Sequence, residues 1–384
     1  MVDYVSEKAK EIQPSATLAV NRRARQLQQE GKEIINLSVG EPDFDTPGVI
    51  KEACQAALKA GFTKYTDSSG ILELRQAICE KLERENGLDY SPEQIVVSNG
   101  AKHSLFNIMM AILNPGEEVI IPAPYWVSYP EMVKLAGGKP VICSRNERFT
   151  ANLDHLRELI TPRTKAFILN SPANPTGVVY TQKELEDLTE ILLSHKILCI
   201  SDEIYEHIVF DGIKAVSIAS LNKEIKERCV VVNGFSKTFS MTGWRLGYLA
   251  APKAIAAAVA NIQSQTASNP VSFVQKAALV ALKYQKNLYR PMVEEFSRRR
   301  EFLLKNLPEV IFYPRPDGAF YFFLSLGKVA SPEMADYLLQ KYYLAVVPGR
   351  DFGADHFIRI SFATSLENLR KAVERLSEAV NNLP

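Results

Sequence analysis

The chain has 384 residues, of which 45 are Lys or Arg and 44 are Asp or Glu, so its formal net charge is +1. This length exceeds the size at which one hydrophobic core stops growing, and we expect one large domain and a smaller one. The balanced charge argues against nucleic acid as the main partner, because such proteins carry a basic surplus or stripe. The longest basic run is Arg298-Arg299-Arg300.

The cysteines and the N-terminus indicate a cytoplasmic protein. No two of the five cysteines are closer than 25 residues, so the chain has no CxxC motif, and we expect free thiols and no bound metal. The first 15 residues lack the apolar core of a signal peptide. No apolar run approaches the roughly 20 residues of a membrane span. We therefore expect a soluble protein.

Short apolar runs rich in β-branched residues recur along the chain, at 94–98, 118–121, 140–143, 166–170, 198–201, 229–233 and 246–250. Because polar and apolar residues do not alternate in them, they indicate strands buried on both faces. Helical patterns lie between several of these runs. One helix is marked by apolar residues from Leu105 to Ile112, and another follows Thr181, an N-cap residue with Glu184 three positions later. This alternation predicts an α/β fold with a mostly parallel sheet.

The pattern changes after about residue 290. An Arg-rich helix, a strand at 318–324, a helix around 332–341 and a strand at 357–362 indicate a smaller α+β domain. The turn that begins at Gly40 leads into the large domain, so the N-terminal segment is expected to join the small one. We predict a large domain at 48–290 and a small domain formed by 1–47 and 291–384.

The predicted strands end in unusual polar residues, and ligands of open α/β sheets bind beyond the carboxyl ends of strands. A helix start at 99–102 offers free N–H groups that suit a phosphate. Trp126 can stack on a heteroaromatic ring, and Asn174 adds an amide. Taken alone, the first two features are more typical of an ordinary strand-to-helix turn and a core tryptophan.

Asp202, Tyr205 and Lys237 follow the next two strands. A carboxylate can keep a pyridine nitrogen protonated, and a tyrosine can donate to a phenolate oxygen on the same ring. A partly desolvated lysine has a lowered pKa and can form a Schiff base. The plainer alternatives are an N-cap aspartate, a core tyrosine and a surface lysine. Together, the strand ends suit a phosphorylated, aromatic, aldehyde-bearing cofactor.

Two arginines call for anionic partners. Arg245 lies eight residues after Lys237, and its planar guanidinium can bind a phosphate with two hydrogen bonds; an ion pair with a neighbouring acid is the alternative. Arg359 lies within an apolar strand, where an unpaired charge is costly. Its partner can be a substrate carboxylate or a structural salt bridge, and the sequence does not decide between them.

Motifs along nearly the whole chain occur in one order: GEPDFDTP (40–47), TKYTDSSG (63–70), SPANPTG (171–177), SDEIYEH (201–207), SKTFSMTGWRLGY (236–248) and RISFATS (359–365). In this combination the chain resembles the aspartate aminotransferase family of pyridoxal-phosphate enzymes, and most closely its bacterial aspartate/prephenate branch. The resemblance implies that family's fold, with a seven-stranded sheet, and a transaminase that works by a ping-pong mechanism with pyridoxal 5′-phosphate.

The resemblance also implies roles for individual residues. Lys237 would form the internal aldimine and then carry the transferred proton. Asp202 would pair with the pyridinium nitrogen, Tyr205 and Asn174 would bind the ring oxygen, and Trp126 would stack on the ring. The phosphate would be held by Gly100, Ala101, Lys102, Ser236 and Arg245, and by Tyr65 of the neighbouring subunit, which implies a homodimer with shared sites. The substrate would be bound by Gly40, Trp126, Asn174, Arg359, Thr17 and Lys102.

The substrate prediction depends on a few positions. In the branch that the chain resembles, Thr17 and Lys102 would receive the distal carboxylate of aspartate or glutamate. Lys102 lies in the first turn of its helix, where the dipole disfavours a lysine, which favours a functional role over a merely solvated one. Gln13 stands where some prephenate-active relatives have a lysine, which argues against prephenate without excluding it. We expect aspartate:2-oxoglutarate transamination.

Other functions stay open. The same fold can serve prephenate, aromatic, alanine or kynurenine-type substrates, or a β-elimination as in C–S lyases. A regulator without turnover usually carries a DNA-binding domain in front, and only 47 residues precede the large domain here. A nicotinamide dehydrogenase would show GxGxxG after a strand, and the chain has none.

Overall fold

The computed structural model describes residues 4–12, 14, 16–325 and 327–382. Its helices are α1 (Glu7–Glu11), α2 (Ala16–Gln29), α3 (Gly48–Lys59), α4 (Leu72–Asn86), α5 (Ala101–Ile112), α6 (Ser128–Leu135), α7 (Leu153–Leu159), α8 (Gln182–Ser194), α9 (Lys223–Lys226), α10 (Lys253–Thr266), α11 (Ser272–Asn306), α12 (Ser331–Tyr342) and α13 (Leu366–Asn381). Its strands are β1 (Ile35–Asn36), β2 (Ile95–Ser98), β3 (Glu118–Pro122), β4 (Lys139–Cys143), β5 (Thr164–Asn170), β6 (Leu198–Asp202), β7 (Cys229–Gly234), β8 (Gly247–Ala250), β9 (Tyr321–Ser325), β10 (Leu344–Ala345), β11 (Val347–Pro348) and β12 (Phe357–Ser361).

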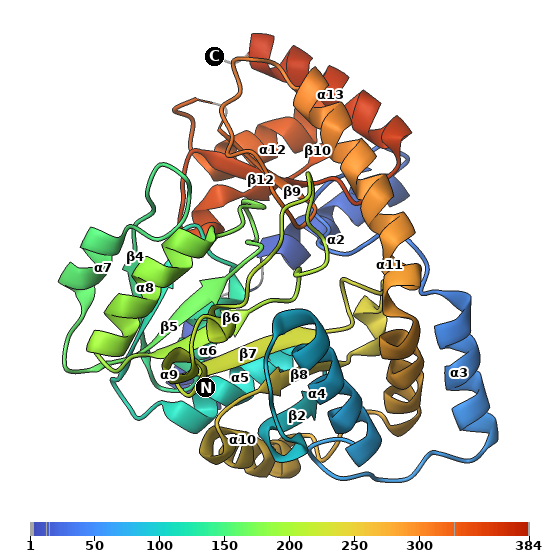
Figure 1. The fold of residues 1–384 in the computed structure, drawn as a ribbon. Helices are drawn as coiled ribbons and strands as arrows, with labels where there is room; N and C mark the ends of the chain where they lie inside the picture. The colour runs from blue at the N-terminus through green and yellow to red at the C-terminus, as the bar shows by residue number, and fades with distance from the viewer. Residues whose placement is uncertain (1–3, 13, 15, 326, 383–384) are drawn as a thin grey trace.

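A seven-stranded sheet in the order β2-β8-β7-β6-β5-β3-β4 forms the centre of the molecule (Figure 1). All neighbouring strands are parallel except β8, which is antiparallel to both β2 and β7. Because β8 is antiparallel to both of these neighbours, β2 and β7 run in the same direction. The carboxyl ends of β2, β3, β5, β6 and β7 therefore share one edge. The predicted α/β fold with a mostly parallel, seven-stranded sheet is confirmed.

Helices cover both faces of this sheet, which is why its strands show continuous apolar runs. On one face, side chains such as Val96, Ile168 and Val232 pack against α5, α6 and α10. On the other face, the adjacent strand residues pack against α4, α8 and the first half of α11. Thr181 caps α8 and exchanges hydrogen bonds with Glu184, as the sequence predicted.

A second core lies above the central sheet in Figure 1. The antiparallel strands β11, β12 and β9 and the helices α12 and α13 form it, together with Ile35 and Leu37 of the N-terminal segment and the second half of α11. Helix α11 runs unbroken from Ser272 to Asn306 and passes through both cores. The domain limits at 47/48 and 290/291 stay a prediction.

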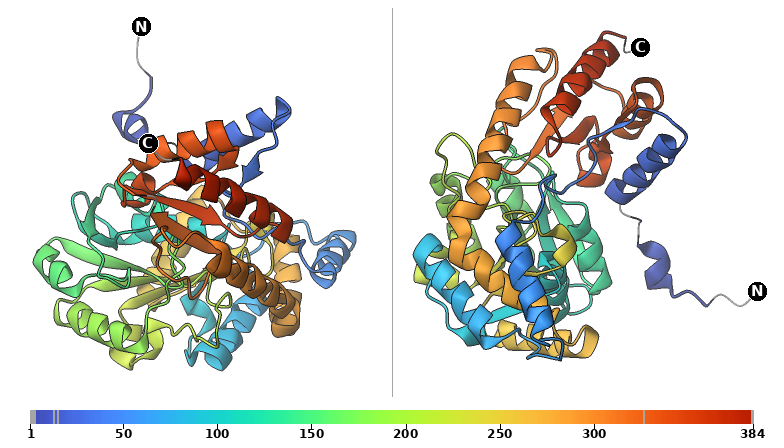
Figure 2. Two further views of the ribbon diagram at one scale, coloured as in Figure 1. Left: turned by 90° about the horizontal axis from the view of Figure 1, so that it is seen from above. Right: turned by 90° about the vertical axis from the view of Figure 1, so that its right-hand side faces the viewer.

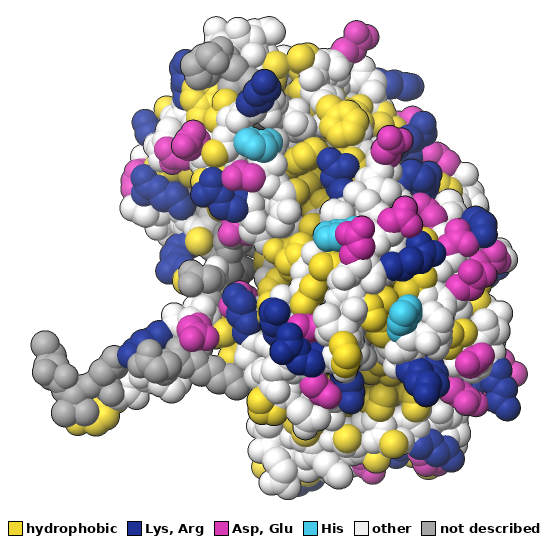
Figure 3. Space-filling view, turned by 90° about the vertical axis from the view of Figure 1, so that its left-hand side faces the viewer, with side chains coloured by type: hydrophobic (Ala, Val, Ile, Leu, Met, Phe, Trp, Pro, Cys, Tyr) yellow, Lys and Arg dark blue, Asp and Glu magenta, His cyan; other side chains and the backbone are white. Residues whose placement is uncertain are grey.

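The surface carries charges of both signs, and the N-terminal helix α1 lies apart from the rest of the molecule (Figure 2, Figure 3). Basic and acidic side chains mix across the face seen in Figure 3, in keeping with their nearly equal numbers. Figure 2 shows α1 standing away from the body of the molecule. Within the ranges that the structure describes, no helix is both long and apolar enough to cross a membrane.

Candidate active site

A cavity of about 460 Å³ opens beside the shared carboxyl edge of the sheet, a volume that suits a small organic ligand. All five polar strand ends contribute to its lining, and so do α2, β9 and β12. The predicted site residues in the lining are Thr17, Gly40, Ala101, Lys102, Trp126, Asn174, Asp202, Tyr205, Ser236, Lys237, Arg245 and Arg359.

Lys237 lies just beyond β7 and points into the cavity. Its Nζ donates a hydrogen bond to the Gly40 carbonyl oxygen at 2.5 Å. Burial lowers the Lys237 pKa to about 8, and the carboxylates of Glu41 and Asp202 oppose this shift. A neutral amine is therefore accessible near physiological pH, and a neutral amine is the form that attacks an aldehyde or accepts a proton.

Asp202 is the last residue of β6 and is buried. Its Oδ2 accepts a hydrogen bond from the Tyr129 hydroxyl at 2.7 Å, and its Oδ1 accepts one from the Ile204 amide at 3.3 Å. Burial raises the Asp202 pKa to about 6, although both hydrogen bonds counteract the rise. A cationic group placed against this carboxylate would offset its desolvation, as a protonated ring nitrogen does.

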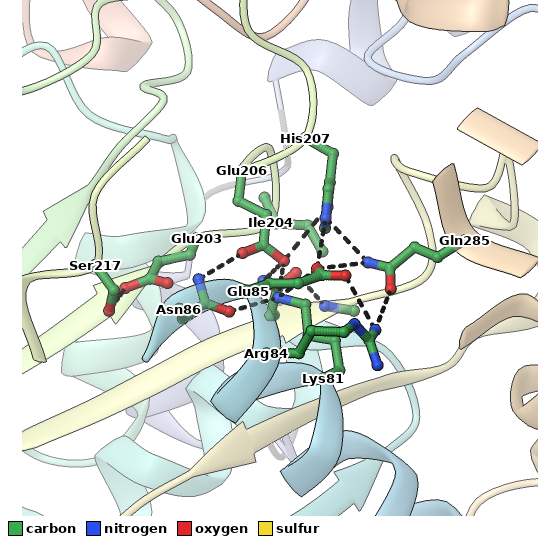
Figure 4. Close-up of polar contacts among 12 residues, drawn as sticks. Lys81, Arg84, Glu85, Asn86, Glu203, Ile204, Glu206, His207, Ser217 and Gln285 are labelled. Atoms are coloured by element: carbon green, nitrogen blue, oxygen red, sulfur yellow. Dashed lines mark hydrogen bonds and ion pairs between the residues drawn. The ribbon is translucent and has the colours of Figure 1, made fainter. Parts of the chain in front are cut away.

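Tyr205 lies in the turn after β6. A buried charge network contacts this turn on the side that faces away from the cavity (Figure 4). The Glu206 carboxylate pairs with Lys81 and accepts hydrogen bonds from Asn86 at 3.0 Å and Asn233 at 2.6 Å. Burial acts to raise the Glu206 pKa, but the Lys81 and His207 charges hold it at about 2. Adjacent residues of one turn thus face opposite ways, with Tyr205 lining the cavity and Glu206 anchored in the network.

The start of α5 forms an anion-binding cradle. Gly100 is its N-cap, with a φ of +89° that side-chain-bearing residues rarely adopt. A Cβ at Gly100 would lie 2.7 Å from Nη2 of Arg245, so only glycine lets this guanidinium close over the helix start. The unpaired N–H groups and the dipole of the helix, together with Arg245 and Ser236, are suited to a phosphate.

Arg359 is buried in β12 and is held by uncharged partners. Its Nη1 donates to Asn174 Oδ1 at 3.1 Å, and its Nη2 donates to the Ser38 carbonyl oxygen at 2.7 Å. Its guanidinium lies over the rings of Tyr321 and Phe352, at 4.5 and 5.2 Å from their centroids. Among the residues that the structure describes, no carboxylate forms an ion pair with it, and its Nε has no hydrogen-bond partner. A buried cation in this state is suited to binding an anionic ligand.

Of the predicted site residues, Lys102 lies at the edge of the cavity and Tyr65 lies outside it. Lys102 lies at the rim, with its Nζ 4.8 Å from the Trp126 ring centroid. Partial desolvation and the Arg245 charge lower its pKa. Tyr65 is 88% exposed and does not line the cavity of its own chain. Gln13 lies outside the described residues.

Residues 32–376, which contain nearly all of this site, match the family of class I and II aminotransferases. The chain belongs to this family. It is 44% identical to an aspartate/prephenate aminotransferase of Nitrosomonas europaea, over 98% of this chain and 100% of the relative. It is also 44% identical to an aspartate aminotransferase of Geobacillus stearothermophilus, over 97% and 98%. The solved structure of Thermus thermophilus aspartate aminotransferase with maleate has a TM-score of 0.94 at 44% identity, over 98% of this chain and 100% of that one.

Membership of the family implies pyridoxal 5′-phosphate as cofactor, and the residues of this aminotransferase fit it. The cavity offers an amine of lowered pKa at Lys237, a buried carboxylate of raised pKa at Asp202 and an anion cradle at Gly100. An amine, a carboxylate and an anion cradle of this kind are suited to the aldehyde, the ring nitrogen and the phosphate of such a cofactor.

Sequence reasoning missed several residues of the aminotransferase site. Tyr129 donates a hydrogen bond to Asp202, which lies 73 residues further along the chain, so its own segment gives no sign of this contact. Tyr321, Phe352 and the Ser38 carbonyl reach Arg359 from distant segments, and no local pattern marks them.

Proposed function

We propose that this aminotransferase binds pyridoxal 5′-phosphate at Lys237 and moves the amino group of aspartate to 2-oxoglutarate. The observation that carries the proposal is the buried Arg359, which has no acidic partner among the described residues and faces the same cavity as the amine of Lys237. A substrate α-carboxylate supplies the missing anion. A second cation, Lys102, lines the cavity from α5 and suits the distal carboxylate of a dicarboxylic substrate.

The proposed cofactor contacts follow from the chemistry of each group. Asp202 would hold the proton of the ring nitrogen, while Tyr205 and Asn174 would bind the ring oxygen and Trp126 would cover the ring. The phosphate would be held by Gly100, Ala101, Lys102, Ser236 and Arg245. When bound, pyridoxal phosphate supplies an aldehyde and a ring that accepts electrons from the substrate Cα.

The chain's own residues would bind the substrate and move its proton. Arg359, Gly40 and Asn174 would hold the α-carboxylate and fix the orientation of the Cα–H bond. The Nζ of Lys237 would take the proton from this carbon and return it during transfer. A pKa of about 8 suits both steps, because a proton carrier works best when its pKa lies near the working pH.

We further propose a homodimer in which Tyr65 completes the phosphate site of the neighbouring subunit. Tyr65 is a large side chain, 88% exposed and outside the cavity of its own chain. A partner subunit would cover this side chain and use its hydroxyl.

A visible absorption spectrum tests the proposal most directly. The protein loaded with pyridoxal phosphate should be yellow, should bleach when aspartate is added, and should recover its colour with 2-oxoglutarate. If aspartate leaves the spectrum unchanged while another amino acid bleaches it, aspartate is the wrong donor. If no amino acid bleaches it, the transaminase mechanism is wrong.

Prephenate is the second candidate amino acceptor, because the Nitrosomonas europaea relative is named an aspartate/prephenate aminotransferase. Adding prephenate to the bleached, amino-loaded enzyme tests this directly. Recovery of the yellow colour would extend the substrate range beyond 2-oxoglutarate.

A further inference from the structure

We propose that Tyr321 is a positioning residue with two separable functions: its hydroxyl directs the hydroxyl of Tyr205 toward the cofactor, and its ring holds Arg359 in place for the substrate carboxylate. The proposal rests on the proposed function, because it assigns Tyr205 to the cofactor ring and Arg359 to the substrate. Tyr321 is the first residue of β9, is fully buried, and lines the cavity.

The hydroxyl of Tyr321 contacts the hydroxyl of Tyr205. Its Oη is 2.8 Å from Oη of Tyr205, and the two rings meet edge to face at 5.8 Å. Burial raises the pKa of both tyrosines, so both hydroxyls keep their protons at physiological pH. Each hydroxyl then has one proton to donate.

The direction of this hydrogen bond follows from proton counting. If Tyr205 donates its only proton to the cofactor ring oxygen, it can meet Tyr321 only as an acceptor. Tyr321 must therefore be the donor of the pair. A hydroxyl that accepts one hydrogen bond becomes a stronger donor of another, because chains of hydrogen bonds polarise one another. Tyr321 thus both orients and strengthens the bond that Tyr205 makes.

The ring of Tyr321 acts on a different partner. The guanidinium of Arg359 lies 4.5 Å from this ring and 5.2 Å from the ring of Phe352. Contacts with two aromatic rings, together with the hydrogen bonds to Asn174 and Ser38, restrain the guanidinium. Because aromatic faces use none of its N–H groups, the arginine keeps donors for a carboxylate.

Gly40 shows how closely these groups are packed. A Cβ built on Gly40 would lie 2.8 Å from Oη of Tyr321 and 3.8 Å from Nη2 of Arg359. Any side chain at this position would press on the Tyr321 hydroxyl. Gly40 is therefore needed for the Tyr321 hydroxyl to reach Tyr205.

The hydroxyl function is tested with Tyr321→Phe, which keeps the ring. The readout is the pH midpoint at which the visible absorption of the bound cofactor changes, measured without substrate. A weaker donor at Tyr205 disfavours the more negative, deprotonated form of the cofactor, so the midpoint should rise by about half to one pH unit. The control is Tyr90→Phe, which removes another buried hydroxyl, one without a hydrogen-bond partner among the described residues. An unchanged midpoint in Tyr321→Phe would overturn the proposal.

A double variant decides whether Tyr321 acts through Tyr205. In a Tyr205→Phe background, the additional change Tyr321→Phe should shift the midpoint no further, because its acceptor is gone. Equal shifts in both backgrounds would show a direct effect on the cofactor and would contradict the positioning role. These titrations need no substrate, so their outcome is independent of whether aspartate is the true donor.

The ring function is tested with Tyr321→Leu. Losing the aromatic face should raise the KM for aspartate about two- to thirty-fold, the range of a cation–π contact, whereas Tyr321→Phe should change it less than about twofold. Equal KM increases in both variants would refute the ring's role. If the wild-type enzyme itself does not react with aspartate, the proposed function fails, and the affinity for the amino acid that does react takes the place of KM.

Discussion

At the scale of single residues, the site is defined by charged groups kept away from water. Burial lowers the pKa of Lys237 to about 8 and raises that of Asp202 to about 6. The same desolvation lowers the pKa of Arg359. Each of these groups is less stable as a charge than it would be in water. A cation placed at Asp202, an anion at Arg359, or a reaction that consumes the neutral amine of Lys237 would relieve this cost. Binding energy at this site therefore comes partly from relieving desolvation.

Replacing Lys102 by Ala should separate dicarboxylic from other substrates. If its ammonium binds the distal carboxylate, kcat/KM for aspartate should fall about 10- to 100-fold, the value of one charged hydrogen bond, and that for alanine less than about threefold. Steady-state kinetics with both donors measure this. Lys223→Ala, an exposed lysine on α9, is the matched control. Equal losses for both donors would rule out this role for Lys102.

The pKa of Lys237 predicts a pH-dependent stability difference in the cofactor-free protein. The folded pKa of about 8 lies below the ordinary value of 10.5, so between these limits the unfolded chain binds more protons and wild-type stability rises with pH. Below pH 8 the burial penalty is fully present. Lys237→Met should therefore be more stable than wild type at pH 7, by up to about 3 kcal/mol, and the difference should vanish near pH 10.5. Thermal unfolding of both proteins across this range checks the sign; a constant difference would contradict it.

At the scale of elements, the turn after β6 links the cavity to the buried charge network around Glu206. It places Tyr205 toward the cavity while Glu206 joins Lys81 of α4 and Asn233 of β7. The turn has short-range backbone hydrogen bonds, from the Glu206 amide to the Glu203 carbonyl oxygen at 2.9 Å and from the Ile208 amide to the Tyr205 carbonyl oxygen at 2.8 Å. The buried pair Lys81–Glu206 ties this turn to α4 as well (Figure 4).

Removing one member of the buried pair should destabilise the protein strongly. Lys81→Met leaves the Glu206 carboxylate buried without its cation, which should cost about 3–5 kcal/mol of unfolding free energy. The double variant Lys81→Met/Glu206→Gln should recover part of this loss. Because the Glu206 pKa is held at about 2, below its ordinary 4.5, the pair's contribution is fully present above pH 4.5 and declines as the pH falls toward 2.

Unfolding in denaturant measures these variants. The exposed pair Lys183–Asp187 on α8 offers the control, since Lys183→Met should cost less than about 1 kcal/mol. Similar losses at the two pairs would mean that the buried network does not restrain the turn.

At the scale of the whole molecule, α11 links two cores. Its first half packs under the central sheet, and its second half packs with β9, β12 and α13. The cavity lies where the two cores meet, because residues such as Asp202 and Lys237 follow the central strands while Arg359 comes from β12. Lys237 even reaches across the chain to Gly40, 197 residues away in sequence.

Hybrid dimers test the proposed sharing of sites. Lys237→Ala should fold and bind pyridoxal phosphate without turnover, and Tyr65→Ala should bind the phosphate weakly. If Tyr65 acts in the neighbouring subunit, a mixed dimer has one intact site, and random reassociation of equal amounts restores about a quarter of all sites. Activity should therefore exceed that of the two variants measured separately. No gain after unfolding and refolding the mixture would place Tyr65 in its own subunit's site or in none.

The sequence by itself determined the fold class, the seven strands of the central sheet and its mostly parallel order. It also predicted which polar residues end those strands, because strand periodicity and motif spacing are local properties of the chain. It left open whether Arg359 pairs with an acid of the protein or with a ligand. Only the tertiary structure decided that no acid of the described chain reaches it.

The tertiary structure alone also produced the supporting contacts. Tyr129 meets Asp202 across 73 residues, Tyr321 meets Tyr205 across 116, and Lys81 meets Glu206 across 125. Each pair joins elements whose relative position is set by packing of the whole sheet and its helices. No pattern within one segment encodes such a contact. For this reason the sequence predicted the residues that we propose for the chemistry, but it did not predict the residues that pack against them.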